Sequence, residues 1–290
     1  MNLGLIIRDS WRITWRSRPL WLLTLLLFAV FIPAGVLSFS FSAVATAITF
    51  PIADPQLLFF IGRLQSVPGP AWVSIAFVAF IVLIATTAVA LILQAATMRG
   101  AALAAEHGKV SLSEALRLGR TRIVNIVKLS LTFGLIIVAL GLLPSLALIL
   151  LGDKSPLGAR LINLAQTGLT PLTTVLNFVL LLALMSIALE DFTPRKAFGR
   201  VGNVFRVGWW AFLLVVGLSG LAALITAIIL VIPVFIAMPV VIFEARTGLL
   251  LFALSYACAG PIAIGFLLFT AVFTLVLYTL IYREAVKLTS

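Results

Sequence analysis

Long stretches of uncharged, apolar residues recur along this chain and restrict its fold more than any other feature. Two of the longest, 209–243 and 247–282, contain 35 and 36 residues without Asp, Glu, Lys or Arg. About 20 apolar residues are enough for a helix to cross the hydrocarbon core of a bilayer. Only helices and closed barrels satisfy their backbone hydrogen bonds in lipid, and barrel strands would show short alternating segments. The sequence therefore predicts an all-α, polytopic transmembrane helical bundle.

The composition supports a membrane protein and argues against a nucleic-acid partner. The chain is 63% hydrophobic and 10% charged, whereas soluble domains are about 45–50% apolar and about 25% charged. Its net charge of +11 comes from Lys and Arg residues that flank the apolar stretches, where they orient spans and meet anionic headgroups. We expect the partners to be the lipid bilayer with its anionic lipids, together with a possible membrane protein, and no nucleic acid.

Six spans are expected within a single integral membrane domain, 1–290. Their approximate positions are 20–43, 72–98, 129–151, 161–189, a fifth span from Trp209 and a sixth ending near Tyr282. A straight helix of 35 residues would be about 50 Å long, against a core of about 30 Å. We therefore expect Pro233 and Pro239 to end the fifth helix, with an apolar external segment over 232–250. Gly260-Pro261 should break or kink the last stretch.

Other connections are expected from their turn residues. Residues 45–70 contain four prolines and predict an external loop, and 152–156 predict a turn. The small-residue run 42–47 resembles a signal-peptidase site, but the preceding apolar segment is long enough to span, which favours an uncleaved span.

Three basic amphipathic helices are expected ahead of the span pairs, at 3–17, 111–125 and 193–206. They divide the domain into three approximate units, 1–98, 99–189 and 190–290. Pro19 should end the first helix. Ser111 and Glu114 form a capping box for the second. Thr193 and Pro194 suit the N-cap and first position of the third, and Glu190 and Asp191 lie where its dipole favours negative charge.

The distribution of basic residues predicts the orientation. With six spans, 16 of the 20 Lys and Arg residues fall on the side that carries both termini. Cytoplasmic loops carry the excess of Lys and Arg, so both termini should be cytoplasmic in a plasma or bacterial inner membrane. Basic residues on the three amphipathic helices are candidates for lipid-headgroup binding: Arg8, Arg12, Arg16, Arg117, Arg120, Arg195, Lys196 and Arg200.

Four amides within the expected spans, Gln94, Asn163, Gln166 and Asn177, have two readings. They could line a polar path, or they could form hydrogen bonds between packed helices. Helix packing is the more common role of an amide within a membrane.

The residues required for catalysis or metal binding are sparse. Cys258 lies in an apolar context and His107 in a polar connector, and these are the only Cys and His of the chain. Such a pair cannot provide a cysteine or histidine metal cluster, and we expect no metal, no cofactor and no catalytic residue. Glu190 and Asp191 form the best-placed acidic pair, for which a structural role is expected rather than acid–base catalysis.

The segments Ala188-Leu189-Glu190-Asp191, Ala197-Phe198-Gly199-Arg200, Trp209-Trp210 and Tyr282-Arg283-Glu284 carry a resemblance. In this order they resemble a group of uncharacterised bacterial six-span proteins, which are similar to the membrane domain attached to some glycerophosphodiester phosphodiesterases. The catalytic domain of those enzymes is missing here, so the resemblance implies no phosphodiesterase activity. We expect a non-enzymatic multi-pass membrane module that organises envelope lipids or holds a partner protein. The alternative is a permease or transporter component for a small or amphiphilic substrate.

Overall fold

The computed structural model describes residues 2–30, 69–108, 110–151, 156–243 and 245–289, and these residues form helices joined by short connections, with no strand among them. Four helical segments are long and apolar enough to cross a membrane: Ile84–His107, Pro171–Glu190, Pro194–Ile236 and Leu250–Lys287. Two further apolar helices, Arg18–Val30 and Ile123–Ile136, are shorter in the described part of the chain. The predicted all-α class is confirmed, whereas the count of six spans stays a prediction.

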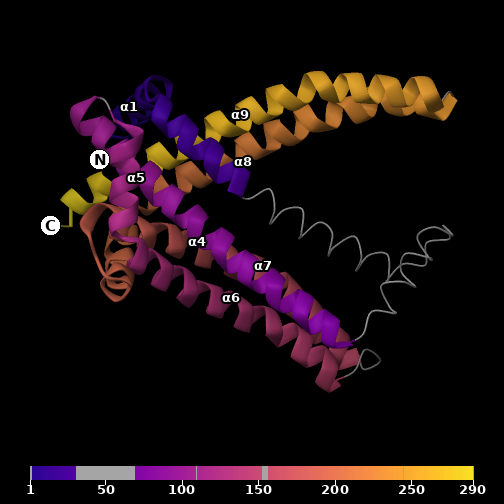
Figure 1. The fold of residues 1–290 in the computed structure, drawn as a ribbon, viewed down its shortest axis with the longest axis horizontal. Helices are drawn as coiled ribbons and strands as arrows, with labels where there is room; N and C mark the ends of the chain where they lie inside the picture. Colours follow the sequence, from indigo (N-terminus) through magenta and orange to yellow (C-terminus); the bar gives the residue numbers. More distant parts are fainter. Residues whose placement is uncertain (1, 31–68, 109, 152–155, 244, 290) are drawn as a thin grey trace. The chain divides into compact units, whose positions relative to one another are not determined.

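Seven labelled helices follow one another along the described chain (Figure 1). They are α1 (Leu3–Arg16), α4 (Gly69–His107), α5 (Leu112–Thr121), α6 (Ile123–Leu151), α7 (Pro156–Glu190), α8 (Pro194–Phe243) and α9 (Ala245–Lys287). The predicted loop at 45–70 and the run at 42–47 lie outside the described residues, except for Gly69 and Pro70, which begin α4. Of the predicted turn at 152–156, only Pro156 is described, and it begins α7.

The chain forms two compact units. Unit 1 contains Met1–Leu25, Gln94–Arg122 and Leu181–Ser290, and unit 2 contains Leu26–Leu93 and Ile123–Leu180. Unit 1 holds the two ends of the chain, α1, α5 and the long pair α8 and α9 (Figure 1). Unit 2 holds the first part of α4, α6 and the first part of α7. The polar clusters, the exposed basic residues and the groove described below belong to unit 1.

The core of unit 1 joins α1, the helix Arg18–Val30, the last turns of α4 and the last part of α9. Its buried side chains are Ile13, Leu20, Ala101, Ala104, Val272 and Val276. Small residues on α4 allow close approach, because a Cβ atom at Gly100 would lie 2.9 Å from Leu20 Cδ2. Small residues at helix contacts are typical of membrane bundles. After α4, Gly108 adopts a φ of +72° and donates its N–H to the Ala104 carbonyl at 2.9 Å, which ends the helix.

Helices α8 and α9 pack along each other, and they correct the prediction that Pro233 and Pro239 end the fifth helix. Helix α8 continues through Pro233 and Pro239 to Phe243, and α9 begins at Ala245. The described residues of 232–250 are therefore helical, and the external position of this segment stays a prediction. Proline removes one backbone donor, and the Tyr256 hydroxyl of α9 donates to the Leu230 carbonyl of α8 at 2.9 Å, within the turn that precedes Pro233. Likewise, α9 continues through Pro261 as one helix, so the break predicted there is wrong.

The boundaries of the expected amphipathic helices also change. Pro19 does not end the first one, since α1 stops at Arg16 and Ser17 donates its N–H to the Ile13 carbonyl at 3.0 Å. The chain is helical again from Arg18, which places Pro19 in a first turn where its missing N–H costs nothing. The third predicted helix, 193–206, is the start of α8 and is continuous with the apolar stretch after it.

Candidate functional site

A group of polar side chains gathers around the end of α7, and we call it the Glu190 cluster. It comprises Arg99, Arg122, Ser186, Glu190, Asp191, Arg200 and Tyr282. Five helical regions supply these residues: the last part of α4, the junction of α5 and α6, the end of α7, the first turns of α8 and the end of α9. The cluster therefore links segments that are far apart in the sequence.

The end of α7 is an unusual chain reversal. Asp191 directly follows the last helical residue and has a φ of +62°, in the left-handed region that non-glycine residues rarely adopt. The Phe192 N–H then donates to the Ser186 carbonyl at 3.5 Å. Pro194 begins α8 two residues later, and the Thr193 carbonyl accepts the Ala197 N–H at 2.9 Å. Thr193 thus occupies the predicted position before the helix.

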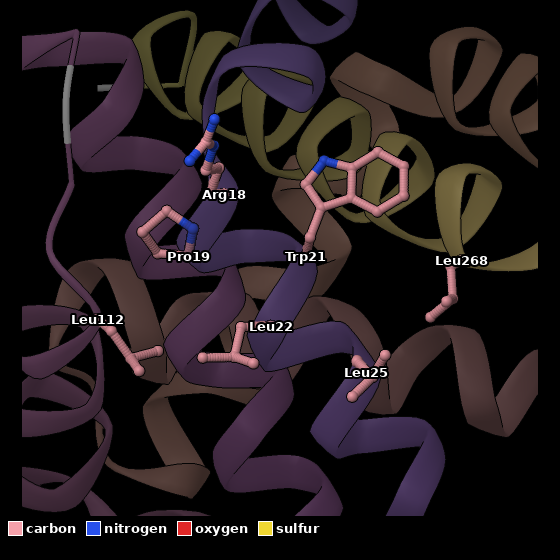
Figure 2. A pocket seen from close by; sticks show the side chains of 7 residues that line it. All are labelled: Arg18, Pro19, Trp21, Leu22, Leu25, Leu112 and Leu268. Carbon is pink, nitrogen blue, oxygen red and sulfur yellow. The ribbon is translucent and has the colours of Figure 1, made fainter. Parts of the chain in front are cut away.

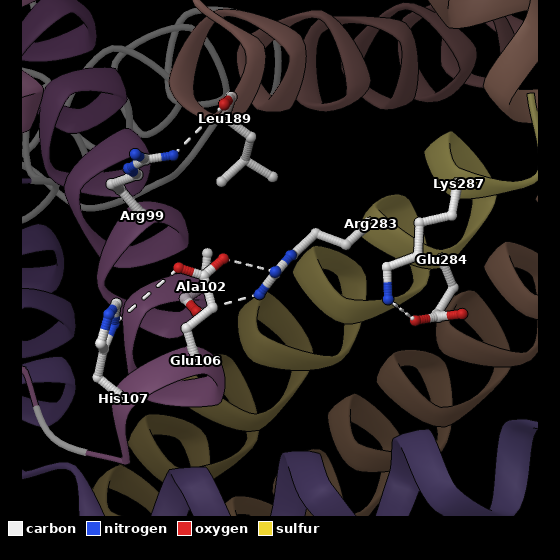
Figure 3. Close-up of polar contacts among 8 residues, drawn as sticks. All are labelled: Arg99, Ala102, Glu106, His107, Leu189, Arg283, Glu284 and Lys287. Carbon is white, nitrogen blue, oxygen red and sulfur yellow. Dashed lines mark hydrogen bonds and ion pairs between the residues drawn. The ribbon is translucent and has the colours of Figure 1, made fainter. Parts of the chain in front are cut away.

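Two arginines cap the last carbonyl groups of α7. Arg122 Nη1 donates to the carbonyl oxygens of Ile187 and Ala188, each at 2.6 Å. Arg99 Nη1 donates to the Leu189 carbonyl at 3.3 Å (Figure 3). The last carbonyls of a helix have no partner within the helix and carry partial negative charge. A guanidinium group therefore stabilises them both by hydrogen bonding and by its positive charge.

Arg122 is held in place between these carbonyls and a carboxylate. Its Nε lies 3.1 Å from Asp191 Oδ1, and its side chain is 14% exposed, whereas that of Asp191 is 69% exposed. Burial lowers the pKa of Arg122, and the negative charge of Asp191 acts in the opposite direction. Guanidinium groups in proteins remain protonated, so Arg122 keeps its charge and all its donors.

Glu190 is the most enclosed carboxylate of the cluster. Its Oε2 lies 3.3 Å from Arg200 Nε, an ion pair without the alignment of a hydrogen bond, and both side chains are 18% exposed. Its Oε1 accepts a hydrogen bond from the Tyr282 hydroxyl of α9. The Ser186 hydroxyl lies 2.6 Å from the same Tyr282 oxygen and 3.1 Å from the Leu182 carbonyl, and its single proton serves one of these two acceptors at a time. Glu190 thus ties the start of α8 and the end of α9 to α7.

A second polar contact joins the ends of α4 and α9. Arg283 donates to the Ala102 carbonyl at 3.1 Å and to Glu106 Oε1 at 2.5 Å (Figure 3). One turn further along α9, Lys287 pairs with Glu284 at 2.6 Å. These contacts are more exposed than the Glu190–Arg200 pair.

Glu190 and Asp191 are expected to interact with the dipole of the helix that follows them. In the structure each of them also contacts a guanidinium group, that of Arg200 or Arg122.

The candidate headgroup-binding residues divide into two groups. Seven are exposed, and we call them the basic surface: Arg8, Arg12, Arg16, Arg117, Arg120, Arg195 and Lys196. They lie on α1, α5 and the first turn of α8, all in unit 1. Arg200 belongs instead to the Glu190 cluster, where its charge is paired. Asn2 and Ser111 cap two of these helices, accepting the N–H groups of Leu5 at 3.3 Å and Glu114 at 3.2 Å.

The structure describes the side chains of two of the four amides. Gln94 is half-buried on α4 and Asn177 is exposed on α7, whereas the side chains of Asn163 and Gln166 lie outside the described set. Neither Gln94 nor Asn177 lines the two cavities found in unit 1. Among the described residues, no group of three or more His, Cys, Asp or Glu side chains could hold a metal ion. Cys258 and His107 are both exposed, and His107 lies 4.0 Å from Glu106 (Figure 3).

Several members of the Glu190 cluster have no strong signal in the sequence. Arg99 and Arg122 look like ordinary connector charges, and Tyr282 looks like an interfacial aromatic residue. One available signal is the short link between Glu190 and Pro194, which forces α7 and α8 to meet at an acidic pair. The identity of the capping arginines depends on tertiary packing.

Comparisons with known proteins give no relative for this chain: no family model, no curated protein and no solved structure matches it.

Proposed function

We propose that the protein is a non-enzymatic, multi-pass module of a bacterial inner membrane. In this proposal six helices span the bilayer and both termini are cytoplasmic. The basic surface contacts anionic lipid headgroups, which lets the module organise lipids or hold a membrane protein partner. The observation that carries the proposal is the large apolar surface that α8 and α9 leave uncovered.

That surface surrounds α8 beyond its contact with α9. In the most apolar 18-residue stretch of Pro194–Ile236, only 11% is buried. Large exposed side chains occur at intervals along it, among them Trp210, Leu221, Leu224, Ile228 and Phe235. Soluble monomers rarely expose contiguous apolar patches larger than a few hundred Å². Lipid tails provide the simplest environment for such a surface.

Aromatic side chains lie next to the basic residues of α1. Trp11 and Trp15 are exposed, and their rings lie 5.1 Å and 5.4 Å from the ring of Phe269. The Trp21 indole is close to the same group and donates to the Thr14 carbonyl at 2.7 Å. Tryptophan prefers the boundary between headgroups and hydrocarbon. This arrangement favours placing α1 at that boundary, with Arg8, Arg12 and Arg16 among the headgroups.

The contacts within the Glu190 cluster support a structural role for this cluster. Each of its two carboxylates contacts a guanidinium group, and the Tyr282 hydroxyl has two partners. Such mutual pairing fixes helix ends and leaves little capacity to act as an acid or base. This is why we propose a module rather than an enzyme.

The lipid part of the proposal predicts a gain in thermal stability in anionic bilayers. Purified protein in phosphatidylglycerol nanodiscs should unfold at a higher temperature than in phosphatidylcholine nanodiscs. The double substitution Arg195→Gln and Lys196→Gln should reduce this gain, since each basic residue near an anionic surface contributes about 1 kcal/mol. The gain should also shrink with added salt, because the Debye length falls from about 10 Å at 0.1 M to about 3 Å at 1 M.

Asn203→Gln is a suitable control, because Asn203 is exposed on the same helix and the change leaves the charge constant. Arg200 is unsuitable for this test, since its removal would break the pair with Glu190. Equal gains in the wild type and the double variant would contradict headgroup binding by this helix. Uptake of a small solute by liposomes that contain the protein would instead favour the transporter.

A further inference from the structure

An open, apolar groove in unit 1 begins beside Arg18. It has a volume of about 510 Å³ and is lined by Arg18, Pro19, Trp21, Leu22, Leu25, Leu112 and Leu268 (Figure 2). These residues come from the helix Arg18–Val30, the start of α5 and α9. The volume lies in the range of ordinary small-molecule sites, about 300–1,000 Å³.

The groove combines one cation with an otherwise apolar lining. Arg18, Leu22 and Leu25 follow a spacing of four and three residues, which places them along one face of the helix. Seven residues of helix correspond to about 10 Å, so the apolar part leads away from the charge. Leu22 and Leu25 are 45% and 49% exposed, which leaves much of the groove uncovered in the described structure.

Arg18 is available to a ligand. Its side chain is exposed, and it forms no ion pair with an acidic residue in the described part of the chain. The basic residues that fix helix ends, Arg122 and Arg283, are by contrast engaged with carbonyl and carboxylate oxygens. A free guanidinium group is a strong partner for a phosphate, with which it forms two parallel hydrogen bonds.

We infer that this groove binds one anionic phospholipid, with its phosphate on Arg18 and one acyl chain along Leu22 and Leu25. The charge of Arg18 selects a phosphate, and the apolar lining selects a hydrocarbon chain rather than a soluble anion. The inference rests on the proposed membrane function, because it needs the helix Arg18–Val30 to begin a span at the headgroup level. The groove differs from the basic surface, whose contact with headgroups is diffuse and includes no site for an acyl chain.

The experiment measures the dissociation constant of dioleoylphosphatidylglycerol from purified protein in detergent, by native mass spectrometry. Arg18→Gln should weaken binding about tenfold, the factor expected for loss of a charge-assisted hydrogen bond. Leu25→Trp should weaken it similarly by filling the groove while leaving Arg18 in place. Arg206→Gln is the matched control, since Arg206 is exposed on α8, lies outside the basic surface and does not line the groove. It should change binding less than twofold.

Two soluble or neutral probes identify what the groove recognises. Glycerol 3-phosphate should bind far more weakly than the lipid, and dioleoylglycerol should show no dependence on Arg18. Equal weakening by Arg206→Gln and Arg18→Gln would overturn the inference in favour of diffuse attraction, and tight binding of glycerol 3-phosphate would leave only an anion site. If Arg18→Gln fails to fold, an unchanged affinity in Leu25→Trp would still overturn it. The two proposals can fail separately. If the Arg195→Gln and Lys196→Gln variant keeps the full stability gain in anionic lipid while Arg18→Gln still weakens lipid binding, only the proposed headgroup binding is contradicted.

Discussion

Replacing Glu190 with alanine should lower the free energy of unfolding of unit 1 by about 3–5 kcal/mol, the range for breaking a buried ion pair. The substitution leaves the guanidinium group of Arg200 enclosed without its counter-charge, since that side chain is only 18% exposed. It also removes the acceptor of the Tyr282 hydroxyl. The loss should appear as an earlier midpoint when the purified protein is unfolded with dodecyl sulfate and followed by circular dichroism.

A graded series separates the charge from the hydrogen bond. Glu190→Gln keeps an acceptor for Tyr282 but loses the charge, so its destabilisation should be smaller than that of Glu190→Ala. Arg200→Met in the Glu190→Gln background should restore part of the loss, because no unpaired charge then remains. Glu284→Gln is the control: its pair with Lys287 is exposed, and such pairs contribute about 0–1 kcal/mol. Equal effects at Glu190 and Glu284 would contradict a structural role for the cluster.

Arg122→Ala should destabilise the protein by about 2–4 kcal/mol. The side chain makes two short hydrogen bonds to the final carbonyls of α7, and bonds to charged groups contribute about 1.5–3 kcal/mol each before non-additivity. Its pair with Asp191 adds little, since that carboxylate is largely exposed. Amide hydrogen exchange should show faster opening at the end of α7, around Phe192, whose N–H closes the chain reversal.

Arg120→Ala provides the matched control, because Arg120 lies on the exposed surface of α5 two residues away. Its effect on stability should be within about 0.5 kcal/mol. Arg122→Lys should fall between the two, since lysine keeps the charge but lacks the planar fork that reaches two carbonyls. A fully stable Arg122→Lys variant would indicate that charge alone holds this helix end.

The features of the fold that depend on local composition follow from the sequence. Uncharged stretches predict the helical class, and Ser111 and Pro194 predict the starts of α5 and α8. Pro233 and Pro239 predict the end of the fifth helix, because proline usually ends a helix. In the structure α8 packs against α9, the Leu230 carbonyl accepts a hydrogen bond from the Tyr256 hydroxyl, and α8 is continuous through Pro233 and Pro239. Tertiary packing thus overrides the local preference of proline.

The candidate sites show the same division. The positions of Arg8, Arg12 and Arg16 on the outside of α1 follow from their four-residue spacing. The pairing of Arg200 with Glu190 depends on how α7 and α8 meet, and the groove beside Arg18 depends on α5 and α9. Sequence patterns describe one helix at a time, so contacts between helices that are distant in the chain cannot be read from them.

Topology reporters test the central claim, a six-span module with cytoplasmic termini, most directly. Fusions should be placed after Gly108, within 152–156 and at the C-terminal end, using one reporter that is active only in the cytoplasm and one that is active only outside it. The proposal predicts that Gly108 and the C-terminal end report the cytoplasm and that 152–156 reports the outside. If only the four long apolar segments crossed the membrane, Gly108 and 152–156 would report the same side, and that result would contradict the six-span arrangement.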